Sequence, residues 1–395
     1  MDINFTLWST NMSGGYKVIF ELANGLVDRG HHVTITALGG DHSWFPLKAR
    51  LNYVKPPWPI KLLSPILKVL LKRPARYYEA LTLTQKLKLG FEPDLVKALS
   101  ENTPECDINI ATWFPTAFAV YRSDKGVPVY LCQDFDELAQ ERGNYFTQMF
   151  HESLYLPFNI ITISGWLKEW IKEKYNKDSD IIINGIDHNV FYPRENIFKV
   201  SNQNVGTKEN ISSDSSEGPK IMSIFRGLSY KGDQDLIDAL KIVSKEVENV
   251  TLVAVGKKEV LEKLLIKEDL NFDFMTFSNA SDDKMAELYS SSDIFAFPSH
   301  IEGFGLPPLE AMACETPVVT ADCLGVRDYV KNGENAFMVP PKKPEALAKA
   351  IINVLNDEEI QKKFKENGLK TASHHTWENA INSFESILIK AMDGK

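Results

Sequence analysis

Apolar residues near the start of the chain alternate between short continuous runs and helical spacing. Residues 3–7 form a run that predicts a strand, apolar positions recur at helical spacing over 18–26, and a second run follows at 33–38. Gly14 and Gly15 lie between the first strand and the helix. This order predicts a βαβ unit, and the nearly continuous apolar strands indicate a parallel sheet that is covered on both faces.

The same alternation continues along the chain in two blocks. Strands are expected at 108–111, 127–131, 159–163 and 180–183 in the first block, and at 220–224, 250–255, 294–297, 318–320 and 336–339 in the second. Helices are expected at 233–243, through 284–289, from 307 and, last, from near 376 to 388. Between the blocks, residues 198–219 are rich in Asn, Ser, Glu, Lys and Gly, which predicts a polar linker or a disordered insertion.

A chain of 395 residues with two such blocks favours two domains. We expect an α/β protein with two doubly wound, Rossmann-like domains, at 1–197 and 220–372, which face each other across a cleft where a small molecule binds. Residues 198–219 would join the domains, and 373–395 would form a C-terminal helix.

The composition is typical of a globular protein that does not bind nucleic acid. Hydrophobic residues make up 44% and charged residues 25%, and the net charge of −9 disfavours a general affinity for nucleic acid. The four cysteines form no Cys-x-x-Cys pair and are expected to be reduced. The N-terminus shows no secretory pattern, and no apolar stretch reaches the roughly 20 residues that span a bilayer. These features predict a cytoplasmic protein.

The segment 298–313 carries the strongest chemical signal, because it combines glycines, prolines and two carboxylates after a predicted strand. Gly305 lets the backbone approach a ligand, Pro307 suits the first turn of a helix, and the N-terminus of that helix suits a phosphate. Glu302 precedes the helix and Glu310 lies about one turn inside it, and either carboxylate can hold the hydroxyls of a ribose or a hexose. By itself, the segment also fits a tight turn with two surface acids.

Two cations follow the strand expected at 220–224. Arg226 comes just after the strand and Lys231 lies on the next loop. The carboxyl end of a strand in an open α/β sheet faces the ligand crevice, so we expect both cations there. They would neutralise a diphosphate and stabilise the charge that develops on it when a sugar departs.

Taken together, these motifs resemble the retaining GT-B glycosyltransferases of family four. The resemblance rests on Glu302-Gly-Phe-Gly-Leu-Pro-Pro-Leu-Glu310 and on Arg226 with Lys231-Gly232. It extends to Gly14-Gly15, to Asn184-Gly185-Ile186-Asp187 and to Trp377 with the last helix, which looks like the family's tail that crosses back onto the N-terminal domain. It covers nearly the whole chain and implies the GT-B fold, a nucleotide-diphosphate-sugar donor and retention of anomeric configuration.

The resemblance also implies a role for each matched residue. Glu302 would act with Arg226 and Lys231 in catalysis, Glu302 on the transferred sugar and the two cations on the diphosphate. Glu310 would hold the ribose, and the base would lie near 277–281. Further donor contacts are implied for Phe304, Gly305, Leu306, Gly14 and Gly15. Neither a metal nor another cofactor is implied, because protein cations and the helix end take that place.

One position departs from the family pattern. Many members carry a histidine after the strand that corresponds to 127–131, whereas this chain has Gln133. Glutamine can orient a hydroxyl but cannot act as a base, so removal of the acceptor proton would fall to Asp134 or to the departing phosphate. Gln133 and Asp134 are therefore the acceptor-side candidates. Asp134-Phe135-Asp136 imitates the metal-binding acid pair of another glycosyltransferase fold, but that fold's other features are missing and no metal site is expected.

Residues 44–76 combine basic and apolar side chains in an acidic chain. No acidic residue occurs between Asp41 and Glu79, and the interval holds eight lysines and arginines among Trp, Phe, Ile and Leu residues. Such a mixture suits docking on an anionic membrane surface. It also suits a helix that packs on the N-terminal domain with a solvated basic edge.

These features predict a glycosyltransferase that moves a sugar from a nucleotide-diphosphate donor to a hydroxyl acceptor, such as a glycan or a lipid-linked saccharide. Two other classes remain compatible. One is a GT-B-fold nucleotide-sugar epimerase or phosphorylase, and the other is a non-catalytic nucleotide-sugar-binding protein, which Gln133 favours. Membrane docking by residues 44–76 would make the protein peripheral on the inner face of the membrane.

Overall fold

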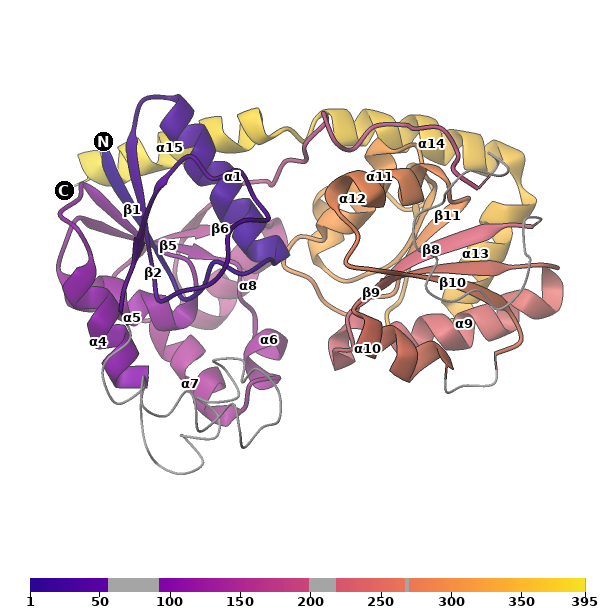
Figure 1. Cartoon of the computed structure of the whole chain (residues 1–395), viewed down its shortest axis with the longest axis horizontal. Coiled ribbons are helices and arrows are strands. Elements are labelled where there is room, and N and C mark those ends of the chain that lie inside the picture. Colours follow the sequence, from indigo (N-terminus) through magenta and orange to yellow (C-terminus); the bar gives the residue numbers. More distant parts are fainter. Residues whose placement is uncertain (56–91, 199–217, 267–269, 395) are drawn as a thin grey trace. The chain divides into compact units, whose positions relative to one another are not determined.

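The computed structural model describes residues 1–55, 92–198, 218–266 and 270–394. The chain divides into two compact units (Figure 1). Unit 1 comprises Met1–Ile183 and Trp377–Lys395, and unit 2 comprises Asn184–Thr376.

Unit 1 is built on a parallel sheet that has seven strands in the described part of the chain, in the order β3-β2-β1-β4-β5-β6-β7. The direction of strand addition reverses between β1 and β4, and the carboxyl ends of strands at such a switch point form the usual ligand crevice. The strands are β1 (Asp2–Leu7), β2 (His32–Ala37), β3 (Arg50–Tyr53), β4 (Ile108–Ala111), β5 (Val127–Cys132), β6 (Asn159–Thr162) and β7 (Ser179–Ile181).

Helices cover both faces of this sheet. Helices α1 and α15 pack together on one face, and α4 and α5 pack together on the other (Figure 1). Most of the apolar residues of α1 are buried, as its helical spacing predicts. The helices are α1 (Gly14–Asp28), α4 (Glu92–Asn102), α5 (Phe114–Ser123), α6 (Asp136–Gln140), α7 (Asn144–Ser153), α8 (Gly165–Tyr175) and α15 (Trp377–Asp393).

Helix α15 is the C-terminal end of the chain, yet it belongs to unit 1. The Phe384 ring packs on Phe5 of β1, with the ring centroids 6.2 Å apart. The Glu385 carboxylate accepts a hydrogen bond from Arg29 Nη1 at 2.6 Å and lies 2.7 Å from His31 Nε2. These contacts tie the last helix to α1 and to the residues before β2.

Unit 2 repeats the architecture with a parallel sheet that has six strands among the described residues, in the order β10-β9-β8-β11-β12-β13. Its switch point lies between β8 and β11. The strands are β8 (Lys220–Phe225), β9 (Thr251–Gly256), β10 (Asp273–Ser278), β11 (Ile294–Phe297), β12 (Val318–Ala321) and β13 (Phe337–Val339).

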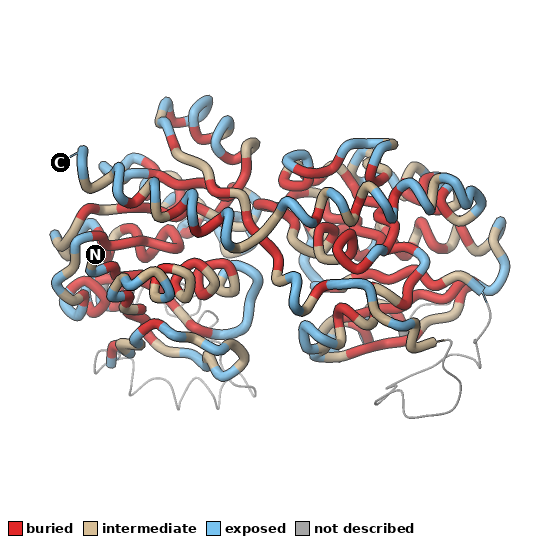
Figure 2. Tube along the Cα trace, turned by 90° about the horizontal axis from the view of Figure 1, so that it is seen from above, coloured by how far each residue is buried: buried red, intermediate tan, exposed pale blue. Residues whose placement is uncertain are grey.

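Helices α9 and α13 pack together on one face of this second sheet, and α11, α12 and α14 lie on the other (Figure 1). Buried segments fill the interior of each unit, and the outer turns of the helices are exposed (Figure 2). The α-helices are α9 (Asp233–Glu246), α10 (Lys258–Leu261), α11 (Asp282–Ser290), α12 (Leu306–Ala313), α13 (Pro344–Asn356) and α14 (Glu358–Ser373). Two short 3₁₀ helices, η1 (Ser229–Lys231) and η3 (Gly325–Asp328), and a π-helical segment, η2 (Glu262–Ile266), accompany them.

The predicted fold class is confirmed, because both units are doubly wound α/β structures with parallel sheets. Every strand predicted from the sequence is present, with ends that differ by at most two residues. The edge strands β3 and β10 were not expected. Both carry polar residues and are only partly buried, so neither has the continuous apolar run that marked the inner strands.

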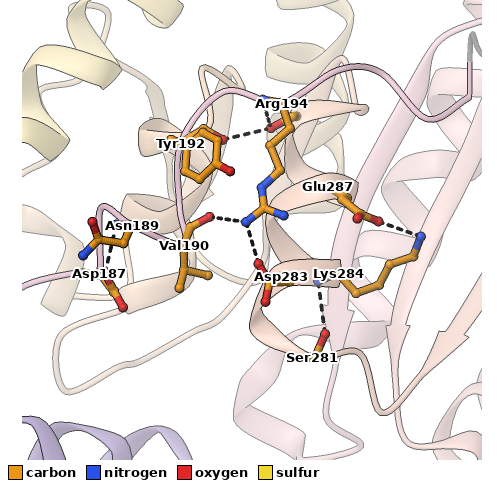
Figure 3. Close-up of polar contacts among 10 residues, drawn as sticks. Asp187, Asn189, Val190, Tyr192, Arg194, Ser281, Asp283, Lys284 and Glu287 are labelled. Carbon is orange, nitrogen blue, oxygen red and sulfur yellow. Dashed lines mark hydrogen bonds and ion pairs between the residues drawn. The ribbon is translucent and has the colours of Figure 1, made fainter.

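The boundary between the units falls earlier than the sequence predicted. Residues 184–197 belong to unit 2 because they bond to α11 and its neighbourhood. Figure 3 shows Arg194, whose Nη2 donates to Asp283 Oδ1 at 2.8 Å and to the Val190 carbonyl at 2.7 Å. The Arg194 N–H donates to Ser290 Oγ at 3.1 Å. The segment thus runs over the surface of unit 2 and is bonded to α11.

Two predictions fall largely outside the described residues: the linker, at 199–217, and most of the basic segment, at 56–76. In the described part of the basic segment, the Trp44 ring stacks on Phe20 of α1, and Lys48 pairs with Asp28 at 2.6 Å. No helix within the described ranges combines the length and the apolar character needed to cross a membrane.

Candidate active site

The loop that follows β11 leads into α12 at the carboxyl edge of the unit 2 sheet. Gly305 is the N-cap residue of α12 and has φ of 85°, a left-handed conformation that favours glycine. A Cβ at this position would lie 3.0 Å from Val326 Cγ1, so the space is also limited. Leu306 is the first helical residue, and Pro307 follows it in the first turn. The predicted glycine loop that opens onto a helix is therefore confirmed.

Glu302 lies on this loop and forms an ion pair with Lys231. Lys231 Nζ donates to Glu302 Oε1 at 2.7 Å, and the two side chains are only 19% and 13% exposed. The ammonium also lies 5.0 Å from the centroid of the Tyr230 ring. The structure thus brings together two of the residues that the sequence singled out on separate loops.

Glu310 lies in α12 and is half-buried. Its Oε2 accepts a hydrogen bond from the Tyr289 hydroxyl at 3.2 Å. Burial, and then the Glu310 charge, raise the pKa of Tyr289 well above its usual value, while the positive charge of Arg226 opposes that shift. The charge of Arg226 thus acts on Tyr289, although the Arg226 side chain is exposed.

Both carboxylates also act on one buried tyrosine behind the loop. The Tyr329 hydroxyl donates to the Gly305 carbonyl. Burial raises the pKa of Tyr329 well above its usual value, and the neighbouring Cys323 and the charges of Glu302 and Glu310 add to the shift. The charged candidates of unit 2 thus gather near the carboxyl ends of β8 and β11, on the two sides of the switch point.

Phe304 was expected to contact the donor, but its side chain is buried within unit 2. It is 3% exposed, and its ring packs against Tyr329 and His375 at centroid distances of 5.4 and 6.4 Å. Phe304 therefore supports the loop from within the unit. At Leu306, where α12 begins, N–H groups have no partner inside the helix and are suited to an anion.

Residues 277–281, where the base was expected, comprise the end of β10 and the turn that leads into α11. Phe277 is buried, and Lys284 Nζ lies 5.8 Å from the centroid of its ring. Ser281 caps α11, since its Oγ accepts from the Lys284 N–H at 3.2 Å (Figure 3). Asn279 is exposed and left-handed, with φ of 53°. The turn lies at the carboxyl edge of the same sheet.

The candidates of unit 1 meet at the first turn of α1. Gly14 and Gly15 are the first two helical residues, and the Ser13 Oγ caps the helix by accepting from the Tyr16 N–H at 3.2 Å. Gln133 Nε2 donates to the Gly15 carbonyl at 3.4 Å. A Cβ at position 14 would meet nothing within 4 Å, so this turn is open on the Gly14 side.

Asp134 is buried beneath this edge, at 4% exposure. Its Oδ2 accepts a hydrogen bond from the Tyr130 hydroxyl at 3.3 Å. Burial raises the pKa of Asp134 to about 7, although the positive charge of Arg142 opposes the shift. Asp136 has a separate setting, because Lys174 Nζ lies 2.5 Å from its Oδ2. The two acids of the supposed metal motif thus interact with different protein groups.

Several residues of this arrangement were not singled out from the sequence. Tyr289 supports Glu310, and Asp233 Oδ2 accepts hydrogen bonds from the N–H groups of Arg226 at 3.1 Å and Gly227 at 2.6 Å. No spacing in the sequence pairs Tyr289 with its partner. The position of Asp233, just after Lys231-Gly232 at the start of a helix, was a visible signal.

Comparisons with known proteins find similarity to glycosyltransferases. The family model for glycosyl transferases group 1 matches residues 207–371. The capsular polysaccharide biosynthesis glycosyltransferase CapM of Staphylococcus aureus is 32% identical over 175 residues, which cover 42% of this chain and 45% of CapM. The aligned part is therefore less than half of that relative's length.

Solved structures extend the similarity to the whole chain. Sucrose-phosphate synthase of Thermosynechococcus elongatus superposes with a TM-score of 0.73 at 16% identity, over 100% of both chains. Anabaena HepE in complex with UDP-glucose superposes with a TM-score of 0.69 at 19% identity, over 99% of both chains. Residues 207–371 thus match the group 1 glycosyltransferases, and the two Rossmann-like units give the chain the GT-B fold.

Proposed function

We propose that the protein transfers a glycosyl unit from a nucleotide-diphosphate sugar to a hydroxyl group of an acceptor, with retention of configuration at the anomeric carbon. The observation that carries the proposal is the shielded Lys231–Glu302 pair beside the start of α12, with Glu310 inside the same helix. The structural neighbour HepE binds UDP-glucose, which supports a donor of this class.

The donor would be held by unit 2. The Glu310 carboxylate would accept hydrogen bonds from the two ribose hydroxyls, as a second interaction beside its bond to Tyr289. The diphosphate would lie against the N–H groups at the start of α12, where the helix dipole favours negative charge. Arg226 and Lys231 would supply the cationic side of this site. With these groups in place, the donor needs no metal ion to balance its diphosphate.

The chemical step breaks the bond between the anomeric carbon and the phosphate oxygen, and the electron pair leaves with the nucleotide diphosphate. A new bond forms between the anomeric carbon and the acceptor oxygen, which loses its proton. Lys231 and Arg226 would stabilise the charge that grows on the diphosphate. Such electrostatic stabilisation of the transition state is the largest contribution to catalysis in many enzymes. Glu302 would accept hydrogen bonds from the sugar and would keep Lys231 close to the departing oxygen.

In unit 1, Gln133 would orient the acceptor hydroxyl, because its amide lies against the open first turn of α1. Gly14 and Gly15 would let that turn approach the donor closely. Asp134 is bonded to Tyr130 and buried, which disfavours direct contact with an acceptor. We therefore assign the acceptor proton to an oxygen of the departing phosphate.

An incubation with a panel of UDP-, GDP-, ADP- and dTDP-linked sugars tests the donor class. A donor at 100 times its dissociation constant is expected to stabilise the protein by about 2.7 kcal/mol, measured as a thermal shift. With that donor, release of nucleotide diphosphate only when a saccharide or lipid-linked acceptor is added supports transfer. The anomeric configuration of the product, read by NMR, tests retention.

The same incubation separates the rival functions. An epimerase would change the sugar of the donor without an acceptor, and a phosphorylase would consume inorganic phosphate and release a sugar phosphate. Binding of the donor with neither hydrolysis nor transfer would indicate a non-catalytic nucleotide-sugar-binding protein.

Peripheral contact with the inner face of a membrane is a separate proposal for a cytoplasmic enzyme. It is supported by the sequence of residues 44–76, which holds eight cations and no acid. Within its described part, Lys48 is paired with Asp28, so the remaining cations would supply most of the attraction. Vesicles with anionic lipid are expected to bind the protein at low salt and release it at high salt. Equal binding to neutral vesicles would contradict the proposal.

A further inference from the structure

The first turn of α9 contacts both loops that carry the charged candidates of unit 2. Asp233 Oδ2 accepts from the N–H groups of Arg226 and Gly227, as described above. Asp235, two residues later in the same turn, reaches the other loop, where its Oδ2 lies 2.6 Å from His300 Nε2. One helical turn therefore holds the backbone beside Arg226 and the loop that carries Glu302.

The His300–Asp235 contact is largely shielded from solvent. The side chains are 16% and 23% exposed. A hydrogen bond to a charged group that is mostly removed from water is worth more than one on the surface. His300 is also held through its backbone, because its N–H donates to the Tyr230 carbonyl at 2.8 Å. This residue is therefore fixed at two points to the segment that includes Lys231.

The two loops also touch at a position that admits only glycine. Gly232 has φ of 66°, and a Cβ there would overlap the Pro298 carbonyl. Lys231 precedes this contact, and Pro298 begins the loop of His300 and Glu302. Three contacts thus join the two segments: the close approach of Gly232 to Pro298, the His300–Asp235 bond and the Lys231–Glu302 ion pair.

We propose that His300 and Asp235 are positioning residues, which hold the Glu302 carboxylate where it meets the sugar of the donor. The inference rests on the proposed function and deepens it, since it assigns this pair to recognition of the sugar rather than of the nucleotide. Glu302 follows His300 by two residues, so a shift of His300 moves the Glu302 backbone. Glu310 has its own support in α12 and Tyr289, and neither depends on His300.

The proposal predicts a selective loss in binding. His300→Ala and Asp235→Ala should each weaken binding of the nucleotide sugar roughly tenfold, as loss of one charge-assisted hydrogen bond implies. Binding of the matching nucleotide diphosphate, which lacks the sugar, should change by less than about twofold. The double variant should lose no more affinity for the nucleotide sugar than the single variant that binds it more weakly, because both substitutions break the same contact. His300→Gln should recover part of the affinity, since its amide can still donate to Asp235.

The experiment is isothermal titration of the wild type and the four variants with UDP-glucose and with UDP, or with whichever nucleotide sugar and nucleotide diphosphate the wild type binds in the panel above. His32 and Asp2 provide the matched control, because their contact of 2.9 Å is exposed and lies in unit 1. His32→Ala should leave both affinities unchanged. Melting temperatures of all variants show whether unit 2 remains folded.

Several results would overturn the proposal. Equal losses of affinity for UDP and UDP-glucose would mean that the pair only stabilises the fold. Additive losses of affinity in the double variant would mean that the two residues act separately. Wild-type affinities in the variants would mean that the bond is irrelevant to binding of the donor. If the wild type binds no nucleotide sugar at all, the proposed function itself fails. That outcome differs from intact wild-type binding with unaffected variants.

Discussion

Gly25 of α1 lies directly against Ile381 of α15, so closely that a Cβ at position 25 would overlap the Ile381 side chain. Glycine is an unfavourable residue inside a helix, by about 1 kcal/mol relative to alanine. Its presence in the middle of α1 is explained by this contact, because any side chain would push the two helices apart. The contact, together with the Glu385 ion pairs, is how the end of the chain is held to unit 1.

Gly25→Ala is expected to destabilise unit 1 by about 1–2 kcal/mol, because overpacking outweighs the gain in helix propensity. All seven tryptophans lie in the sequence of unit 1, so urea unfolding followed by tryptophan fluorescence reports on that unit alone. Introducing Gly25→Ala into an Ile381→Ala background should cost much less, since the truncated side chain leaves room. If Gly25→Ala is instead more stable than the wild type, α1 and α15 can move apart without a cost in stability.

Glu310→Ala is expected to weaken nucleotide diphosphate binding about 10- to 100-fold, as the loss of hydrogen bonds to a carboxylate implies. The measurement is isothermal titration with the nucleotide diphosphate of the donor that the wild type binds. Tyr289→Phe should have a smaller effect, because it removes the support of Glu310 and leaves the carboxylate in place. Glu315, exposed and just after α12, provides the control, and Glu315→Gln should bind as the wild type does.

Lys231→Ala is expected to lower kcat about 10²- to 10³-fold, the usual effect of removing one group that stabilises developing charge. Lys231→Arg should retain more activity, since it keeps the charge and the ion pair with Glu302. The measurement is the rate of nucleotide diphosphate release at saturating donor and acceptor. Lys97→Ala removes an exposed lysine paired with Glu101 and should have no effect. Near-normal turnover of Lys231→Ala would remove the argument for leaving-group stabilisation.

The inner strands were predictable because a parallel strand covered on both faces needs an unbroken apolar run, as Phe295 to Phe297 show. The charged site residues were predictable because Glu302 and Lys231 lie next to glycines in the loops that follow strands, where sheet topology gathers ligands. Their supporting partners were not. Tyr289 lies on α11, and only the packed structure shows that its hydroxyl meets α12.

The sequence likewise does not show which acidic side chains are buried, although burial decides their role. Asp134 follows a strand and was assigned to the acceptor side, as any polar residue at that edge would be. Burial cannot be read from a single position in a loop, because it depends on which residues pack over it. The structure places Asp134 below Gln133, bonded to Tyr130, and this difference decides which of the two can face a substrate.

The burial of Asp134 predicts a pH dependence of stability that Asp134→Asn should remove. Burial raises its pKa from the ordinary 3.8 to about 7. Between these values the folded protein keeps a proton that the unfolded chain has lost, so the free energy of unfolding falls as pH rises from about 4 to about 7. The stability that the protonated Asp134 carboxyl contributes is fully present below about pH 4 and is lost above about pH 7. Asparagine keeps the size and a hydrogen-bond acceptor for Tyr130, and it does not ionise.

Urea unfolding by tryptophan fluorescence at pH 5 and pH 8 measures this difference in unit 1 alone. Relative to the wild type, Asp134→Asn should be more stable at pH 8 than at pH 5, by up to a few kcal/mol, since each pH unit within the window is worth about 1.4 kcal/mol. From pH 8 to pH 9 the difference should stay constant, because the carboxyl is then ionised in both states. A difference that is the same at pH 5 and pH 8 would show that the carboxyl ionises normally in the folded protein, and Asp134 would then become a stronger candidate for the acceptor's base than the departing phosphate.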